Sequence, residues 1–261
     1  MNFKKNIAYL SAALFVCTLI RIFQIIFLVE YSNGFYYVGK ELLGNLCMVL
    51  IALICAGLVF FAFKTEKIDV TPPKTDWLLA IISVVVAATL FSELFSENMP
   101  MTMTAGQVFA IKMLTAFTAV YFIVFCMQYI VGFKMPPLLH IMPIIYATAK
   151  TIFTFINLSS LALISDNILL LASYCSLMPL FISYGKLHNG IEEKRGFTKF
   201  LATSCVSAVI TITASVPNII INLFSKQPYI HTNTDVLITL FAFGIFAIVF
   251  ICKSVDKKEH I

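Results

Sequence analysis

Two polar residues, Arg21 and Gln24, lie inside the first long apolar run of the chain. A guanidinium group binds carboxylate or phosphate through two parallel hydrogen bonds. Placed centrally in a bilayer, an arginine costs at least about 2.5–3.5 kcal/mol to insert, so it should be paired or face water. Three residues could meet it at a similar depth: Glu93, Glu30 and Gln24. Arg21 therefore either forms a structural ion pair with Glu93 or anchors an anionic group that enters from outside.

A second cation, Lys150, is expected near the middle of a later apolar run. An amine at that depth either loses its proton or meets a carboxylate, so its partner is Glu93, a ligand or water. Lys150 belongs to a polar face spaced at helical intervals that also holds Tyr146, Thr154 and Asn157. These residues make Lys150 and Asn157 candidates for ligand binding.

The run at 199–224 carries a longer polar face. Small hydroxylated residues at such spacing are typical of close helix packing in membranes, whereas the bulkier amides of Asn218 and Asn222, beside Pro217, are the better candidates for lining a cavity. We expect this face and the face of Lys150 to point inward, toward each other or toward a shared polar space. The members of the longer face are Ser204, Ser207, Thr211, Ser215, Asn218 and Asn222.

Composition identifies the structure that must position these groups. The 261 residues are 60% hydrophobic and only 12% charged, with a mean hydropathy of +0.95, whereas soluble domains have about 25% charged residues. The chain is therefore predicted to be an all-α, polytopic transmembrane helical bundle in the cell membrane. The basic residues fall in short loops between apolar runs, which indicates membrane topology and argues against nucleic-acid binding.

Eight runs are long enough, at about 20 residues each, to cross the bilayer. The connections between them are short, so we predict a single integral membrane domain over 1–261. The first run continues through Arg21 without a signal-peptidase site, and is expected to be an uncleaved helix. The predicted helices lie near 7–29, 42–63, 77–96, 107–131, 139–162, 166–185, 199–224 and 235–252.

The loop charges predict an orientation. With a cytoplasmic N-terminus, the inner segments contain 13 of the 18 basic residues and the outer segments contain two, Lys40 and Lys226; the other three, Arg21, Lys112 and Lys150, lie within helices. This asymmetry follows the positive-inside rule, so both termini are expected in the cytoplasm. The inner residues are Lys4, Lys5, Lys64, Lys67, Lys74, Lys134, Lys186, Lys194, Arg195, Lys199, Lys253, Lys257 and Lys258.

The helices differ in composition. Those at 42–63 and 235–252 are almost purely apolar and are expected to face lipid. Pro143, Pro179 and Pro217 fall within three helices of the second half. Proline removes a backbone donor and usually kinks a helix, so the second half is expected to hold the broken or mobile helices.

Motifs of known chemistry are missing from the sequence. It has no H-E-x-x-H, G-x-S-x-G, glycine-rich phosphate loop or C-x-x-C. The seven cysteines lie in or beside the apolar runs, where cysteine usually behaves as a small hydrophobe. We predict no catalytic residue, no metal site and no cofactor, which makes an enzyme the least favoured class.

Two short segments carry a resemblance. The run Arg21-Ile-Phe-Gln24 followed by Glu30 and Gly34-Phe35, and the segment Tyr184-Gly-Lys186, resemble a group of uncharacterised bacterial polytopic membrane proteins with about eight helices. The resemblance implies the same topology. That group has no established activity to transfer.

Two functions fit these observations. The first is a carrier or permease-like protein that binds a small anionic ligand in a polar intramembrane cavity near Arg21, Lys150, Asn218 and Asn222. The second is a ligand-sensing or scaffolding membrane protein whose polar network is structural. In that case the basic loop at 186–199 would meet a cytoplasmic partner or anionic lipid. A water-sized path to Lys150 would favour the carrier.

Overall fold

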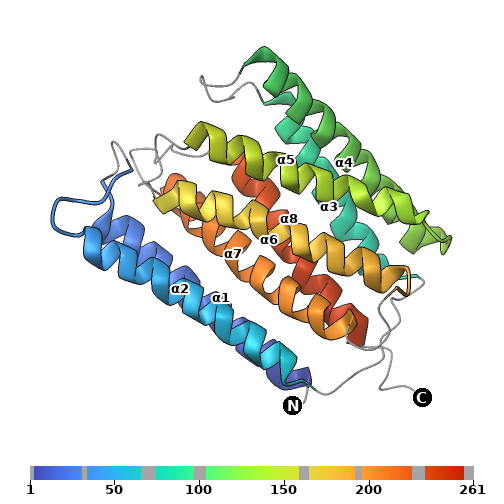
Figure 1. Cartoon of the computed structure of the whole chain (residues 1–261), viewed down its shortest axis with the longest axis horizontal. Helices are drawn as coiled ribbons and strands as arrows, with labels where there is room; N and C mark the ends of the chain where they lie inside the picture. The colour runs from blue at the N-terminus through green and yellow to red at the C-terminus, as the bar shows by residue number, and fades with distance from the viewer. Residues whose placement is uncertain are drawn as a thin grey trace.

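Eight α-helices, all long and apolar enough to cross a membrane, make up the described part of the chain (Figure 1). The computed structural model describes residues 3–30, 34–65, 75–96, 104–158, 165–191, 196–224 and 233–255. The predicted helices are all present, with ends that differ by a few residues. Their bounds are α1 Phe3–Leu28, α2 Glu41–Phe63, α3 Trp77–Phe95, α4 Ala105–Val131, α5 Ile141–Leu158, α6 Ser165–His188, α7 Gly196–Phe224 and α8 Thr234–Val255; the 3-10 turn η1, Pro137–His140, leads into α5.

Local capping explains several helix ends. The Asp76 carboxylate accepts hydrogen bonds from the backbone N–H groups of Leu78 and Leu79 at 2.9 and 3.2 Å and begins α3. Thr104 and Gln107 form a reciprocal capping box at the start of α4. That helix ends at Gly132, whose φ of 81° is strained for residues with a side chain. Polar residues thus set the limits of segments whose interiors are apolar.

The bundle has two ends, here called the N-side and the far side. The N-side contains the starts of α1, α3, α5 and α7 and the ends of the other four helices. Contacts across it include Asn6 to Thr65 at 2.5 Å and the ion pair of Lys253 with Asp76 at 3.6 Å. The far side holds the opposite helix ends. Asn233 donates to Ser96 there, at 2.7 Å.

Helices α3 to α8 form a closed ring, because each packs on the next and α8 returns to α3. The hairpin of α1 and α2 packs on the outside of this ring, against α7. Figure 1 shows the hairpin at one edge of the molecule and α4 at the opposite edge, with α6, α7 and α8 between them.

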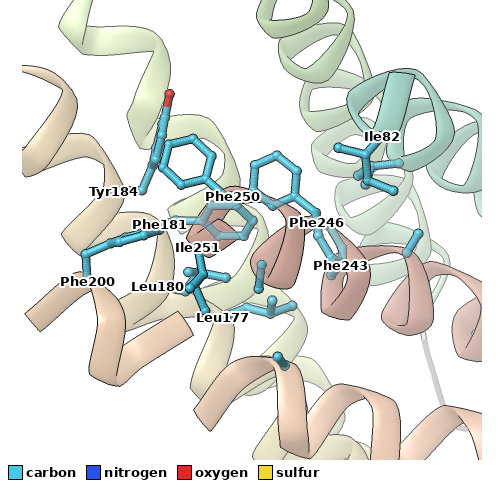
Figure 2. Close-up of a cluster of buried hydrophobic side chains, with 14 of the residues drawn as sticks. Ile82, Leu177, Leu180, Phe181, Tyr184, Phe200, Phe243, Phe246, Phe250 and Ile251 are labelled. Atoms are coloured by element: carbon cyan, nitrogen blue, oxygen red, sulfur yellow. The ribbon is translucent and has the colours of Figure 1, made fainter. Parts of the chain in front are cut away.

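Aromatic side chains fill the ring. Phe122 of α4 lies 5.8 Å from Phe243 of α8 and 6.1 Å from Phe181 of α6, measured between ring centroids. Figure 2 shows Phe243, Phe246 and Phe250 of α8 in this cluster, with Ile82 on one side and Phe181 and Tyr184 on the other. The centre of the ring is an apolar, largely aromatic core that joins helices far apart in sequence.

Of the two helices expected to face lipid, α2 is exposed along much of its length, as that expectation requires, whereas α8 is largely buried and the expectation is wrong for it. Leucines along α2, such as Leu42 and Leu53, are exposed, whereas Leu240, Phe243 and Phe250 of α8 are buried. Both helices are almost purely apolar in sequence, so composition could not distinguish the exposed helix from the buried one. Three of the buried side chains of α8, Phe243, Phe246 and Phe250, are large aromatic rings that fill the interior of the helix ring.

Gly244 allows α8 to approach α7 closely. A Cβ atom there would lie 2.6 Å from Ile212 Cγ1 and 2.7 Å from Thr211 Oγ1, too close for either contact. We expect Gly244→Ala to destabilise the fold by about 1–3 kcal/mol, the usual range for overpacking. Gly57→Ala is the matched control, because its Cβ would meet nothing within 4 Å. Thermal unfolding in detergent should separate the two variants, and equal midpoints would contradict this packing.

Candidate functional site

Arg21 is completely buried, and its guanidinium group is paired with Asp166 at the start of α6. The same group donates to the side-chain oxygen of Gln24 one turn along α1, and to Ser165 Oγ at 3.0 Å. Of the partners that the sequence offered for Arg21, Gln24 is therefore confirmed and an ion pair with Glu93 is wrong. Asp166 takes that role because the first turn of α6 lies against the far-side half of α1, a lateral contact that depth alone could not identify.

Gln24 extends this cluster toward α2. Its amide nitrogen donates to the Tyr36 hydroxyl at 2.5 Å and to the Gly44 carbonyl at 3.0 Å. A Cβ atom on Gly44 would lie 2.3 Å from the Tyr36 ring, so only glycine leaves room for this ring position. Burial raises the pKa of the Tyr36 phenol, which keeps its hydroxyl protonated. Gln24 therefore joins the charged pair to the hairpin of α1 and α2.

Asn218 joins the cluster from α7. Its amide nitrogen donates to Asp166 Oδ1 at 3.1 Å and back to the Ala214 carbonyl at 3.0 Å. The cluster of Arg21, Gln24, Ser165, Asp166 and Asn218 thus links α1, α6 and α7; it is called the arginine cluster below.

Three buried atoms near the arginine cluster have no hydrogen-bond partner among the described residues. They are Arg21 Nε, Asn218 Oδ1 and the Oδ1 atom of Asn222, one turn further along α7. An unpartnered buried polar group costs about 1–3 kcal/mol. Asn222 itself is half-buried. One donor and two acceptors thus retain hydrogen-bonding capacity at this end of α7.

Lys150 and Glu93 form a second buried ion pair, between α5 and α3. Glu93 is thus the partner of Lys150, one of the three alternatives that the sequence left open. The Tyr146 hydroxyl donates to the other carboxylate oxygen at 3.3 Å. The Lys150 amine also lies 5.7 and 5.8 Å from the ring centroids of Tyr146 and Tyr174. A carboxylate and two aromatic faces enclose this cation.

The two polar faces predicted on α5 and α7 do not converge on one space. Helix α6 packs against both α5 and α7, and Lys150 and Asn218 belong to different clusters. The hydroxyl groups of Thr211 and Ser215 bond to backbone carbonyls of their own helix, at 2.7 Å each, as close packing requires. The side chain of Asn157 lies outside the described part of the structure.

A third polar group lies near the N-side between α4, η1 and α6. Tyr121 OH and His140 Nδ1 are 2.9 Å apart, and Gln128 Nε2 and His188 Nε2 are 3.3 Å apart. The two imidazole rings lie 4.9 Å from each other. Within the described ranges, no three His, Cys, Asp or Glu side chains are grouped so that they could hold a metal ion.

The sequence interpretation missed Asp166, Ser165 and Tyr174. Asp166 was one of six acidic residues near the far side, and its position at a predicted helix start placed it at the membrane surface rather than beneath it. Its neighbours Ser165 and Asn167 are residue types usual at a helix start, so the sequence held no signal that Asp166 pairs with Arg21.

Comparison of the chain with models of protein families, with curated proteins and with solved structures gives no match. Chemically, the site offers two enclosed cations, each with its own carboxylate, at the far side of an aromatic core.

Proposed function

We propose that the protein is a ligand-sensing or scaffolding membrane protein whose intramembrane ion pairs are structural. The observation that carries the proposal is the enclosure of Arg21, whose side chain has no exposed surface and is already paired with Asp166. A cation that must receive a transported anion would need access and an unengaged charge. Lys150, paired with Glu93 and with only 8% of its surface exposed, supports the same reading.

We further propose that the protein resides in the cell membrane with its N-side toward the cytoplasm. The distribution of basic residues supports this orientation: 13 belong to the N-side segments and two to the far-side segments. The basic segment at 186–199, which runs from the last turn of α6 to the first turn of α7, is then the surface for a cytoplasmic partner or anionic lipid. Lys194 and Arg195 of this segment lie outside the described residues.

A carrier of a small anionic ligand is the second candidate. It is favoured by the unpartnered atoms Arg21 Nε, Asn218 Oδ1 and Asn222 Oδ1, which lie around one end of α7. It is also favoured by Pro179 and Pro217, which fall within α6 and α7. Proline frees a backbone carbonyl and permits bending, as in carriers whose broken helices surround a midplane site.

Ligand-dependent stability separates the two candidates. The purified protein is heated in detergent with millimolar phosphate, acetate, aspartate or citrate. A structural network predicts the same unfolding midpoint in each at constant ionic strength, because no anion can reach Arg21. An anion that raises the midpoint by several degrees in the unmodified protein and in Lys112→Gln, but not in Arg21→Gln, would overturn the proposal in favour of a carrier.

A further inference from the structure

A groove of about 400 Å³ opens on the surface of the bundle between α2 and α6, with α7 as its floor. Both walls pack against α7. Carbon atoms dominate the lining, which includes Val59 and Phe63 of α2, Pro179 and Ile182 of α6, and Ala202 and Val206 of α7. The groove lies outside the arginine cluster and is not used by the proposed ion-pair network.

The few hydroxyl groups in the groove already have partners. Ser183 and Thr203 lie 3.1 Å apart and join α6 to α7. Ser183 also donates to the Pro179 carbonyl, and Thr203 donates to the Lys199 carbonyl at 3.0 Å. The lining of the groove is therefore apolar along most of its length.

Among the described residues, the cations that line the groove lie at one end of it. Lys186 is in the last turn of α6 and Lys199 in the first turn of α7, so one wall and the floor each contribute an amine at the N-side. Ser176, which also lines the groove, is ten residues from Lys186 along α6. That separation is about 15 Å at the helical rise, or about half of a 30 Å hydrocarbon core.

From this geometry we propose that the groove binds an anionic phospholipid, with its phosphate beside Lys186 and Lys199 and one acyl chain along α7. The length of the apolar part fits a chain of a single leaflet. The two cations fit a negative headgroup at its surface. Basic pockets between transmembrane helices on the cytoplasmic side suit such headgroups, and the sequence predicts that the N-side faces that leaflet.

A tryptophan introduced into the groove can report on its occupant. The chain has one tryptophan, Trp77, so the reporter protein is Trp77→Phe combined with Phe63→Trp. It is reconstituted in vesicles that contain brominated phosphatidylglycerol or brominated phosphatidylcholine, and quenching gives the relative binding of each lipid. Phosphatidylglycerol is expected to bind on the order of twentyfold more strongly, about fivefold for each of the two amines. Equal quenching by the two lipids would overturn the proposal.

Charge and shape variants test the two halves of the site separately. Lys186→Gln and Lys199→Gln should each reduce the preference for phosphatidylglycerol about fivefold, whereas Lys134→Gln, an exposed N-side lysine outside the groove lining, should leave it unchanged. Val206→Phe, which narrows the groove, should also reduce the preference while both amines remain. If the preference for phosphatidylglycerol survives Val206→Phe, the lysines act only as surface charges. That result would overturn the proposal that the groove is the lipid site.

This inference specifies the anionic lipid that the proposed function names as a partner. It rests on the proposed orientation for the leaflet in which that lipid lies. The vesicles carry brominated lipid in both leaflets, so the measurement itself does not depend on orientation. A negative result in the quenching experiment would disprove lipid binding in the groove, but it would not affect the proposal that the ion pairs are structural. Those are tested by the anion titration, which uses no lipid.

Discussion

Replacing Asp166 with alanine is expected to destabilise the folded protein by about 3–5 kcal/mol, the usual cost of removing one partner from a buried ion pair. Arg21 has no exposed surface, and an arginine stays charged in proteins. The variant would therefore keep an uncompensated cation inside the bundle. Asn218, which donates to the same carboxylate oxygen, would lose its acceptor as well. Thermal and SDS-induced unfolding of the purified protein measure the loss.

Two further variants make this result specific. Glu41→Gln removes an exposed carboxyl group at the start of α2 and should change stability by less than about 0.5 kcal/mol. Arg21→Met combined with Asp166→Leu replaces the pair with apolar side chains, and should recover at least half of the loss. A loss below about 1 kcal/mol for Asp166→Ala would show that Arg21 reaches water or another acceptor, contrary to the structure.

The second large effect is expected for Glu93→Ala, at about 2–4 kcal/mol. This variant removes the carboxylate from Lys150 and the acceptor from the Tyr146 hydroxyl. The loss should be smaller than for Asp166→Ala, because a lysine can release its proton when it loses its partner and an arginine cannot. The faces of Tyr146 and Tyr174 would also still lie near the amine.

The same unfolding assays rank the two ion pairs. Lys112→Met is the control, since it removes a helix-borne cation that is only half-buried and should change stability little. Glu93→Leu with Lys150→Met should restore part of the stability lost in Glu93→Ala. If Glu93→Ala proved more damaging than Asp166→Ala, the ranking by proton release would be refuted.

Hydropathy along the chain predicted the eight helices because each helix satisfies its own backbone hydrogen bonds and needs only a continuous apolar length. The ends at Asp76 and Gly132 depend on capping within a few residues. Arg21 and Lys150 could be singled out as groups in need of partners for a similar local reason: an unpaired charge in an apolar run is costly wherever the run lies.

Which side chains from different helices lie beside one another depends on the tertiary structure. Arg21 and Asp166 are 145 residues apart, and their pairing requires the first turn of α6 to reach α1, which no local pattern encodes. In the sequence, Glu93 could have been the partner of Arg21 or of Lys150. The ring arrangement places α3 and α5 away from α1, so Glu93 pairs with Lys150. Burial of α8 followed from the same packing.

By itself, then, the sequence determined that this is an eight-helix membrane protein and which polar groups must be satisfied within it. Only the tertiary structure decided which carboxylate satisfies each cation, that Arg21 is closed off from solvent, and that the ring is filled by aromatic side chains. The physical reason is that helix formation and insertion depend on neighbours a few residues away, whereas ion pairing and core packing depend on contacts between helices distant in sequence.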